Sequence, residues 1–232
     1  MSEWWTYRIS SFLLFSPRTY YRLFEIYNAA IWPAQIAVIL LGLAIPVLVL
    51  RCAAARGRSI AGILAACWLF IAIAFHAHRY ATINFAAVYF AWAFGLEAAL
   101  LIWIGVVRDR LQFGRARDLT GWVGLGMYVF ALLAEPLVGP VLGREWRGVE
   151  IFGVAPDPTA IATLGILLLA RGRGRWLLMV IPVIWCATTG VFLTAMQAPD
   201  AWIAPVAASL AVVIATWQTR RAANRVRDPS LG

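Results

Sequence analysis

The sequence predicts an all-α integral membrane protein, folded as a single bundle of about seven transmembrane helices. Hydrophobic residues make up 62% of the 232-residue chain and charged residues only 13%, about half the charged fraction of a soluble domain. The apolar residues also fall in long blocks, and a helix needs about 20 such residues to cross a bilayer. The basic residues lie between these blocks, as the loops of a membrane protein require.

The N-terminal segment, residues 1–28, is predicted to be an interfacial segment and not a cleavable signal, because it has no short apolar core before a small-residue cleavage site. Ser16 and Pro17 suit the cap and the first position of a helix, and Phe15 would pack on Tyr20 as a hydrophobic staple. The spacing of three and four residues then places one apolar face on this helix: Tyr20, Leu23, Phe24 and Tyr27. We expect the helix to lie on the membrane, with its aromatic rings in the headgroup layer: Trp4, Trp5, Tyr7, Tyr20, Tyr21 and Tyr27.

The transmembrane domain is predicted to cover residues 29–219, and an arginine-rich tail, residues 220–232, follows it. The expected spans are residues 29–50, 60–77, 84–107, 120–142, 157–170, 176–196 and 202–219. The fifth is short, since only about 13 residues follow Pro158, and Val149–Ala155 could add length as a broken or re-entrant piece. Small residues opening the fourth span favour a close helix crossing there: Gly121, Gly124 and Gly126.

Arginine placement gives the expected orientation of the spans. The net charge is +9 and lysine is absent. Arginines gather after the first, third and fifth spans and in the tail: Arg51, Arg56, Arg58, Arg108, Arg110, Arg115, Arg117, Arg171, Arg173, Arg175, Arg220, Arg221, Arg225 and Arg227. This alternation predicts an outside N-terminus and a cytoplasmic C-terminus, and it favours seven crossings over six. It also argues against nucleic acid as a partner, because the charge lies in short membrane loops.

Several function classes are disfavoured by what the sequence lacks. Retinal needs a lysine for its Schiff base, and the chain has none. The three cysteines, Cys52, Cys67 and Cys186, have no spacing typical of a disulfide framework or a zinc site. No common hydrolase, zinc-protease or phosphate-loop motif occurs, and no inverted repeat is evident. We therefore predict no catalytic residue, no metal ligand and no cofactor.

Ionisable side chains inside membrane spans are costly and often functional, which singles out a small set of residues. Glu97 lies well inside the third span, Glu135 precedes Pro136 in the fourth, and His76 ends the second. With Asn84 and Asp157 on the same outer side, they predict a substrate-binding pocket that opens outward above the buried Glu97. The set is His76, Asn84, Glu97, Glu135 and Asp157.

Each of these residues also has a structural interpretation. Glu97 could be a hydrogen-bonded packing residue between helices, Glu135 could reach water at the headgroups, and His76 could bond a neighbouring backbone group. Asp157 before Pro158 is typical of a helix N-cap. A proline-interrupted short span is also where transporters place binding sites, and the two interpretations of Asp157 are compatible.

The stretch Phe152–Thr159, followed by Leu164 and Gly165, resembles the loop signature of a family of bacterial multi-pass membrane proteins of unknown function, some of them labelled permeases. Phe15–Tyr20, Leu23–Asn28 and the residues His76, Ile83, Asn84, Ala86 and Ala87 are similar to the same family. The resemblance implies a bacterial cytoplasmic (inner) membrane protein. The family pattern has a cysteine in place of Asp157, which weakens a soft-metal site with a thiolate at that position. It has a glutamine in place of Glu97, which argues against an obligatory carboxylate there.

Three functions remain open at this point. The leading hypothesis is a permease for a small solute or ion. The second is a non-catalytic subunit or scaffold of a membrane complex, and the third is an enzyme or metal site that uses His76, His78 and a carboxylate. The expected partners are the lipid bilayer, a small solute or ion, and either a second copy of the chain or a membrane complex.

Overall fold

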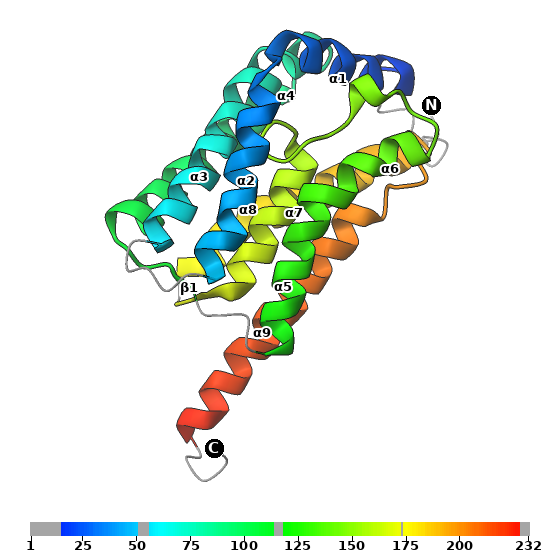
Figure 1. The fold of residues 1–232 in the computed structure, drawn as a ribbon. Helices are drawn as coiled ribbons and strands as arrows, with labels where there is room; N and C mark the ends of the chain where they lie inside the picture. Colours follow the sequence, from blue (N-terminus) through cyan, green and yellow to red (C-terminus); the bar gives the residue numbers. More distant parts are fainter. Residues whose placement is uncertain (1–14, 51–55, 114–117, 173, 228–232) are drawn as a thin grey trace, which may run out of the picture.

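A computed structural model describes residues 15–50, 56–113, 118–172 and 174–227, and these residues are almost entirely helical (Figure 1). The α-helices are α1 (Pro17–Ile31), α2 (Ala34–Leu50), α3 (Arg56–Phe70), α4 (Ala87–Leu100), α5 (Leu119–Val129), α6 (Glu135–Val141), α7 (Pro156–Leu169), α8 (Gly174–Ala195) and α9 (Ile203–Arg227). The predictions made for Trp4, Trp5, Tyr7 and Cys52 fall outside the described residues.

Shorter helical turns extend several of these helices. Three are π-helical: η3 (Ile71–Ala77), η5 (Leu101–Val107) and η6 (Phe130–Ala134). Two are 3₁₀-helical: η4 (Tyr80–Thr82) and η7 (Trp146–Gly148). One departure from a purely helical fold is a two-residue ribbon in which β1 (Gln112–Phe113) pairs antiparallel with β2 (Ala170–Arg171).

Within the described residues, five helical stretches are long and apolar enough to cross a membrane: Arg56–Thr82, Ala87–Val107, Leu119–Val141, Gly174–Ala195 and Ile203–Asn224. A sixth is reached if α1 and α2, which meet at an angle of 91°, count as one broken span. Helix α7 has only 14 residues, as the short fifth block predicted. The described chain is therefore nearly all helical, with five or six apolar helices that could span a membrane.

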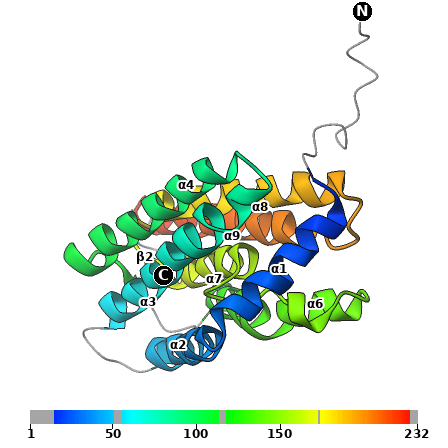
Figure 2. The same ribbon diagram turned by 90° about the horizontal axis from the view of Figure 1, so that it is seen from above.

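The first helix begins as its sequence predicts. The hydroxyl of Ser16 accepts a hydrogen bond from the Thr19 N–H at 3.2 Å, Pro17 follows at the first helical position, and Phe15 stacks on Tyr20 at 5.9 Å. The four predicted face residues are all buried. They are buried by protein, however: α1 lies across one end of the bundle (Figure 2), and Tyr27 donates its hydroxyl to the Val154 carbonyl at 3.0 Å. The rings of Tyr20 and Tyr27 are therefore not the headgroup anchors that we expected.

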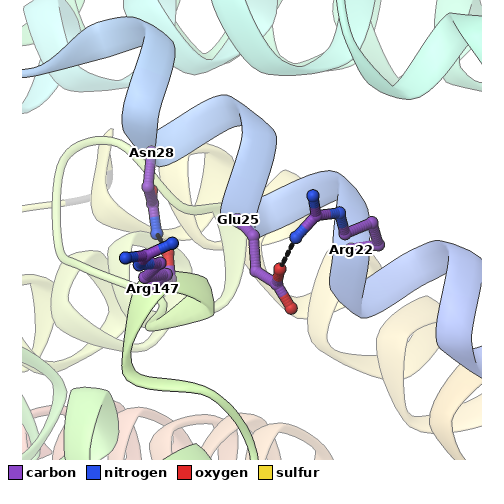
Figure 3. Close-up of polar contacts among 4 residues, drawn as sticks. All are labelled: Arg22, Glu25, Asn28 and Arg147. Atoms are coloured by element: carbon purple, nitrogen blue, oxygen red, sulfur yellow. Dashed lines mark hydrogen bonds and ion pairs between the residues drawn. The ribbon is translucent and has the colours of Figure 1, made fainter.

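A pair of backbone contacts fixes α1 to the loop that leads into α7. The Asn28 amide donates to the carbonyl of Arg147 (Figure 3) and to that of Val149, each at 2.9 Å. One turn earlier, Arg22 forms an ion pair with Glu25 (Figure 3). Helix α1 thus caps the end of the bundle at which the site described below is found.

Helix α7 runs through the middle of the bundle, and all 14 of its residues are buried. A helix that is apolar on every side is expected to be buried in this way. Its closest neighbour is α5, because a side-chain carbon on Gly124 or Gly165 would lie 2.6 Å from the other residue's carbonyl oxygen. The predicted close crossing is confirmed at Gly124, whereas Gly126 has no atom within 4 Å of that position.

The two ends of the bundle differ in charge. We call the end covered by α1 the α1 end, and the opposite end, where the β1–β2 ribbon and the last turns of α9 lie, the arginine end (Figure 1). The Arg58–Asp109 ion pair, 3.0 Å long, joins the first turn of α3 to the loop after η5 there. Arginines described at this end are Arg56, Arg58, Arg108, Arg110, Arg171, Arg175, Arg220 and Arg221. The arginine-rich loops predicted to share one side of the membrane thus do share one end of the bundle.

Candidate functional site

Five carboxylates surround a small cavity at the α1 end, which we call the acidic cavity. Its acidic residues are Glu135, Glu145, Glu150, Asp157 and Asp200, and Arg144 is the one basic residue among those that line it. The free volume is about 40 Å³, enough for about two or three water molecules or a small ion. A metabolite would not fit without movement of the surrounding helices.

Four segments bring these side chains together. Glu135 is the first residue of α6, directly after the π-helical turn η6, and Asp157 is the second residue of α7. Glu145 and Glu150 lie in the connection between those two helices, and Asp200 lies in the turn between α8 and α9. Pro136 explains the irregularity at Glu135, since proline lacks the N–H that a regular helix needs. Such π-helical turns occur frequently at functional sites.

Asp157 does not cap its helix, and this prediction is wrong. Helix α7 starts at Pro156 with Ala155 at the cap. No side chain caps this helix; the hydroxyl of Thr159, in its first turn, instead holds the preceding loop, accepting from the Gly153 N–H at 2.8 Å and donating to the Ala155 carbonyl at 2.7 Å. The Asp157 carboxylate is left to accept hydrogen bonds from α8.

Two donors on α8 share one oxygen of that carboxylate. The Trp185 indole N–H lies 2.7 Å, and the Thr189 hydroxyl 2.9 Å, from Oδ1 of Asp157. The side chain is 7% exposed and belongs to the wall of the acidic cavity. Asp157 therefore combines a structural role, tying α7 to α8, with a position at the cavity.

Charge in the cavity wall is only partly balanced. Arg144 forms an ion pair with Asp200 and its guanidinium lies 4.7 Å from the centre of the Tyr21 ring. Burial lowers the pKa of Arg144, but the hydrogen bond to Asp200 and its charge outweigh that effect and raise the pKa above its ordinary value. Oε2 of Glu135 and Oδ1 of Asp200 have no hydrogen-bond partner in the described part of the chain. Neighbouring carboxylates with so little compensation favour a proton or a cation.

The excess of negative charge in the cavity wall also affects Glu150, in the loop before α7. Burial raises the pKa of Glu150 well above its ordinary value, and the charge of Asp157 raises it further, while Arg144 opposes the shift. Like charges that share a site cannot all ionise readily. The surroundings of Glu150 thus favour its protonated form more than water does for a free carboxyl group.

His76 lies next to the cavity and not in its wall. It is fully buried in η3, and its ring centre is 4.4 Å from that of Phe94 and 4.9 Å from that of Trp185. Neither of its ring nitrogens has a hydrogen-bond partner among the described residues. Trp185 therefore touches the histidine with its ring and Asp157 with its N–H, which links the two predicted site residues.

Asn84 and Glu97 lie apart from the acidic cavity. Oδ1 of Asn84 accepts the Ala86 N–H at 3.0 Å, just before α4 begins. Glu97 is fully buried on α4, one turn after Phe94, and both of its carboxylate oxygens lack a partner in the described residues. Of the five predicted site residues, the structure thus places Glu135 and Asp157 in one cavity wall and His76 beside it.

The described residues contain no group of three or more histidine, cysteine or acidic side chains that could hold a metal ion. His76 and His78, considered together in the metal hypothesis, differ in environment because His76 is buried and His78 is exposed. Cys67 and Cys186 are both free and buried, as expected for small core residues.

A family model matches residues 18–226, from the second residue of α1 almost to the end of α9. The chain belongs to DUF6064, a family of unknown function. Comparison with curated proteins and with solved structures finds no match. Membership of DUF6064 agrees with the resemblance to a family without an assigned activity, and it carries no activity of its own.

Sequence reasoning missed most of the cavity wall. Glu145, Glu150 and Asp200 were not singled out, because each falls in a loop where a charged residue is ordinary. The available signal was the side of the membrane on which each residue was expected. All three follow a span that ends on the side where Glu135 and Asp157 lie. Trp185 and Thr189 carry no signal, since donors on one helix cannot be assigned to an acceptor on another without the packing.

Proposed function

We propose that this chain is a permease for a proton or a small monovalent cation, and that the acidic cavity is its outer binding site. The observation that carries the proposal is the ratio of five carboxylates to one arginine around a cavity of about 40 Å³. A cation would be attracted by the excess negative charge, and the volume restricts the solute to the size of a few waters. Ionisable residues at membrane depth are typical of ion and proton pathways.

The arrangement of cavities around α7 supports a role in transport. The acidic cavity lies at the first turn of α7, and a second, basic cavity lies at its last turn. The helix between them is enclosed by protein on all sides. A short helix in the centre of a bundle, with a polar site at its end, is a common location for a transported ion.

We further propose seven crossings with an outside N-terminus and a cytoplasmic C-terminus, in the inner membrane of a bacterium. The four arginine-rich connections lie together at the arginine end, which supports a cytoplasmic position for that end. In this proposal α7 is the remaining crossing, although its 14 residues are fewer than the usual length of a span. Reporter fusions after Arg227 and within the loop at Arg147 test this orientation: the first should be active only with a cytoplasmic reporter, and the second only with an external one.

The direct test of the permease is cation and proton flux in sealed liposomes that contain the purified protein. Asp157→Asn and Glu135→Gln, alone and together, remove charge from the cavity with little change in shape. Asp109→Asn is the matched control, because Asp109 is a carboxylate at the arginine end. Flux through the wild type and Asp109→Asn, but not through the double variant, is expected. Equal flux through all three proteins would exclude the acidic cavity as the site.

A second candidate, a non-catalytic subunit of a membrane complex, is favoured by the end of α9. The last turns of this helix extend beyond the bundle (Figure 1), and residues 219–224 are exposed. An isolated helix end with exposed arginines suits a protein partner. Purification from native membranes under mild conditions tests this: a stable partner at fixed ratio that is lost when residues 220–232 are removed would support it.

A further inference from the structure

A large cavity with a basic wall lies at the arginine end, where α7 ends, and we call it the basic cavity. It has a volume of about 610 Å³, within the range of about 300–1,000 Å³ typical of ligand sites. Arg171, Arg175 and Arg221 contribute positive charge, and Asp118 is the one carboxylate among its lining residues. Nothing proposed for the acidic cavity uses this site, which lies at the other end of α7.

Arg175 gives the cavity a fixed positive charge. The side chain is 8% exposed, and its guanidinium donates only to uncharged acceptors. These are Oε1 of Gln218 at 2.6 Å, Oγ1 of Thr219 at 2.9 Å, and the carbonyls of Ala215 and Ala170 at 2.9 and 3.3 Å. The contacts hold the arginine between α7, α8 and α9, but none of them neutralises it. Among the described residues no ion pair is recorded for Arg175.

The other two arginines of the wall can reach a ligand. Arg171 and Arg221 are both exposed, and neither forms an ion pair in the described residues. Asp118 is already engaged: its carboxylate accepts the Gly121 N–H at 3.0 Å and caps α5. That hydrogen bond lowers the pKa of Asp118, and the nearby charge of Arg171 contributes in the same direction. With three arginines and one carboxylate, the wall of the cavity keeps an excess of two positive charges.

Two tryptophans line this cavity, as is expected of a site at the level of the lipid headgroups. Trp176 and Trp217 line it, and the guanidinium groups of Arg175 and Arg221 lie 5.7 and 5.0 Å from their ring centres. Tryptophan is enriched where a bilayer meets water, and here α8 begins and α9 leaves the bundle. A cavity at that level would give its ligand access to the membrane as well as to water.

We propose that the basic cavity binds the phosphate of an anionic phospholipid headgroup. Arg171 and Arg221 would contact the phosphate, Arg175 would supply fixed positive charge beside it, and the two indole rings would border the glycerol and upper acyl chains. Arginine suits this role because its planar, branched donor group matches a phosphate. Basic pockets between helices at the cytoplasmic face are a known mode of anionic lipid recognition.

Thermal unfolding of the purified protein in a neutral detergent tests this assignment. The probes are dioleoyl phosphatidylglycerol, dioleoyl phosphatidylcholine and inorganic phosphate, each titrated at constant ionic strength. We expect a saturable rise in unfolding temperature with phosphatidylglycerol alone, because a ligand bound only by the folded state stabilises it. A comparable rise with inorganic phosphate would overturn the lipid assignment in favour of a free-phosphate site, and a comparable rise with phosphatidylcholine would overturn recognition of charge.

The variant Arg171→Gln/Arg221→Gln should raise the midpoint of the phosphatidylglycerol titration at least about tenfold, since two ionic contacts are removed. Arg108→Gln is the matched control, because Arg108 also stacks on a tryptophan at the same end, 4.7 Å from the Trp103 ring, but lies outside the cavity. An equal loss in the control would show that the lipid responds to total charge and would overturn the site. Should the double variant not fold, the same titration of Arg221→Gln alone is compared with that of Arg108→Gln.

Discussion

Trp185 on α8 donates its indole N–H to the carboxylate of Asp157 on α7, over 2.7 Å and inside the bundle. The same indole ring packs on His76. One residue thus connects the central helix, the acidic cavity and the buried histidine of η3. The hydrogen bond also fixes the position of the carboxylate. Its strength depends on whether Asp157 is ionised, so measuring it tests the charge of that carboxylate.

Trp185→Phe should lower the free energy of unfolding by about 1.5–3 kcal/mol, the range for a hydrogen bond to a charged group, if Asp157 is ionised. The phenyl ring keeps most of the packing on His76, so the change mainly removes the donor. Trp68→Phe is the matched control, because its indole donates to the neutral hydroxyl of Thr163 at 2.9 Å, and about 1 kcal/mol is expected. Denaturant unfolding in detergent measures both, and equal losses would contradict an ionised Asp157.

Gly165→Val should destabilise the protein by several kcal/mol, about 3 or more, because a side chain there meets the backbone of α5. The contact is with the Gly124 carbonyl oxygen at 2.6 Å, which cannot move aside as a flexible side chain would. Gly126→Ala, with open space around it, should be neutral or stabilising by about 0.5–1 kcal/mol. Thermal unfolding of the two variants separates them, and a tolerated valine at Gly165 would contradict the close crossing of α5 and α7.

Glu150→Gln should stabilise the protein at neutral and alkaline pH and leave it unchanged below about pH 4. The sign follows from the raised pKa of Glu150 in the folded state. The folded protein retains this proton more tightly than the unfolded chain, so the wild type loses stability as the pH rises from the unfolded pKa, about 4.3, through the folded value. Glutamine stays neutral throughout and avoids that loss. Unfolding temperatures from pH 4 to pH 9 measure the difference, and a variant that parallels the wild type would contradict it.

Glu97→Met should raise the free energy of unfolding by about 1–3 kcal/mol, since it removes a buried carboxyl whose oxygens have no partner in the described residues. Glu97→Gln, which keeps the polar group and matches the family pattern, should change stability little. Neither should alter cation flux, because Glu97 does not line the acidic cavity. Loss of stability in the methionine variant would show that the carboxyl has a partner in the folded protein.

The sequence predicted those parts of the fold that depend on local pattern. The Ser16 cap, the buried face of α1, the short block that became α7 and the grouping of arginine loops follow from spacing and charge. What the sequence could not predict depends on packing between distant segments. Helix α1 bends away from α2 and covers the bundle, so Tyr20 and Tyr27 are buried by protein. Asp157 accepts hydrogen bonds from two donors on α8, and the helix that it was expected to cap begins one residue before it, at Pro156.

The residues of the acidic cavity also divide into those that the sequence pattern predicted and those that depend on packing. Glu135 and Asp157 were found because a carboxylate beside a proline in an apolar block is unusual. Glu145, Glu150 and Asp200 join them only because the α6–α7 connection and the α8–α9 turn meet at the α1 end. Their contribution is electrostatic and depends on distance, which no spacing along the chain reveals.

The most direct test of the acidic cavity is the dependence of unfolding temperature on small cations at constant ionic strength. Sodium and potassium are each exchanged against choline, which is too large for a cavity of about 40 Å³, in the wild type, Asp157→Asn and Asp109→Asn at several pH values. A binding site predicts a saturable rise of a few degrees, about 2–4 °C, with a small cation or with protons, retained in Asp109→Asn and lost in Asp157→Asn. Identical curves for all three proteins would contradict a cation site in the acidic cavity.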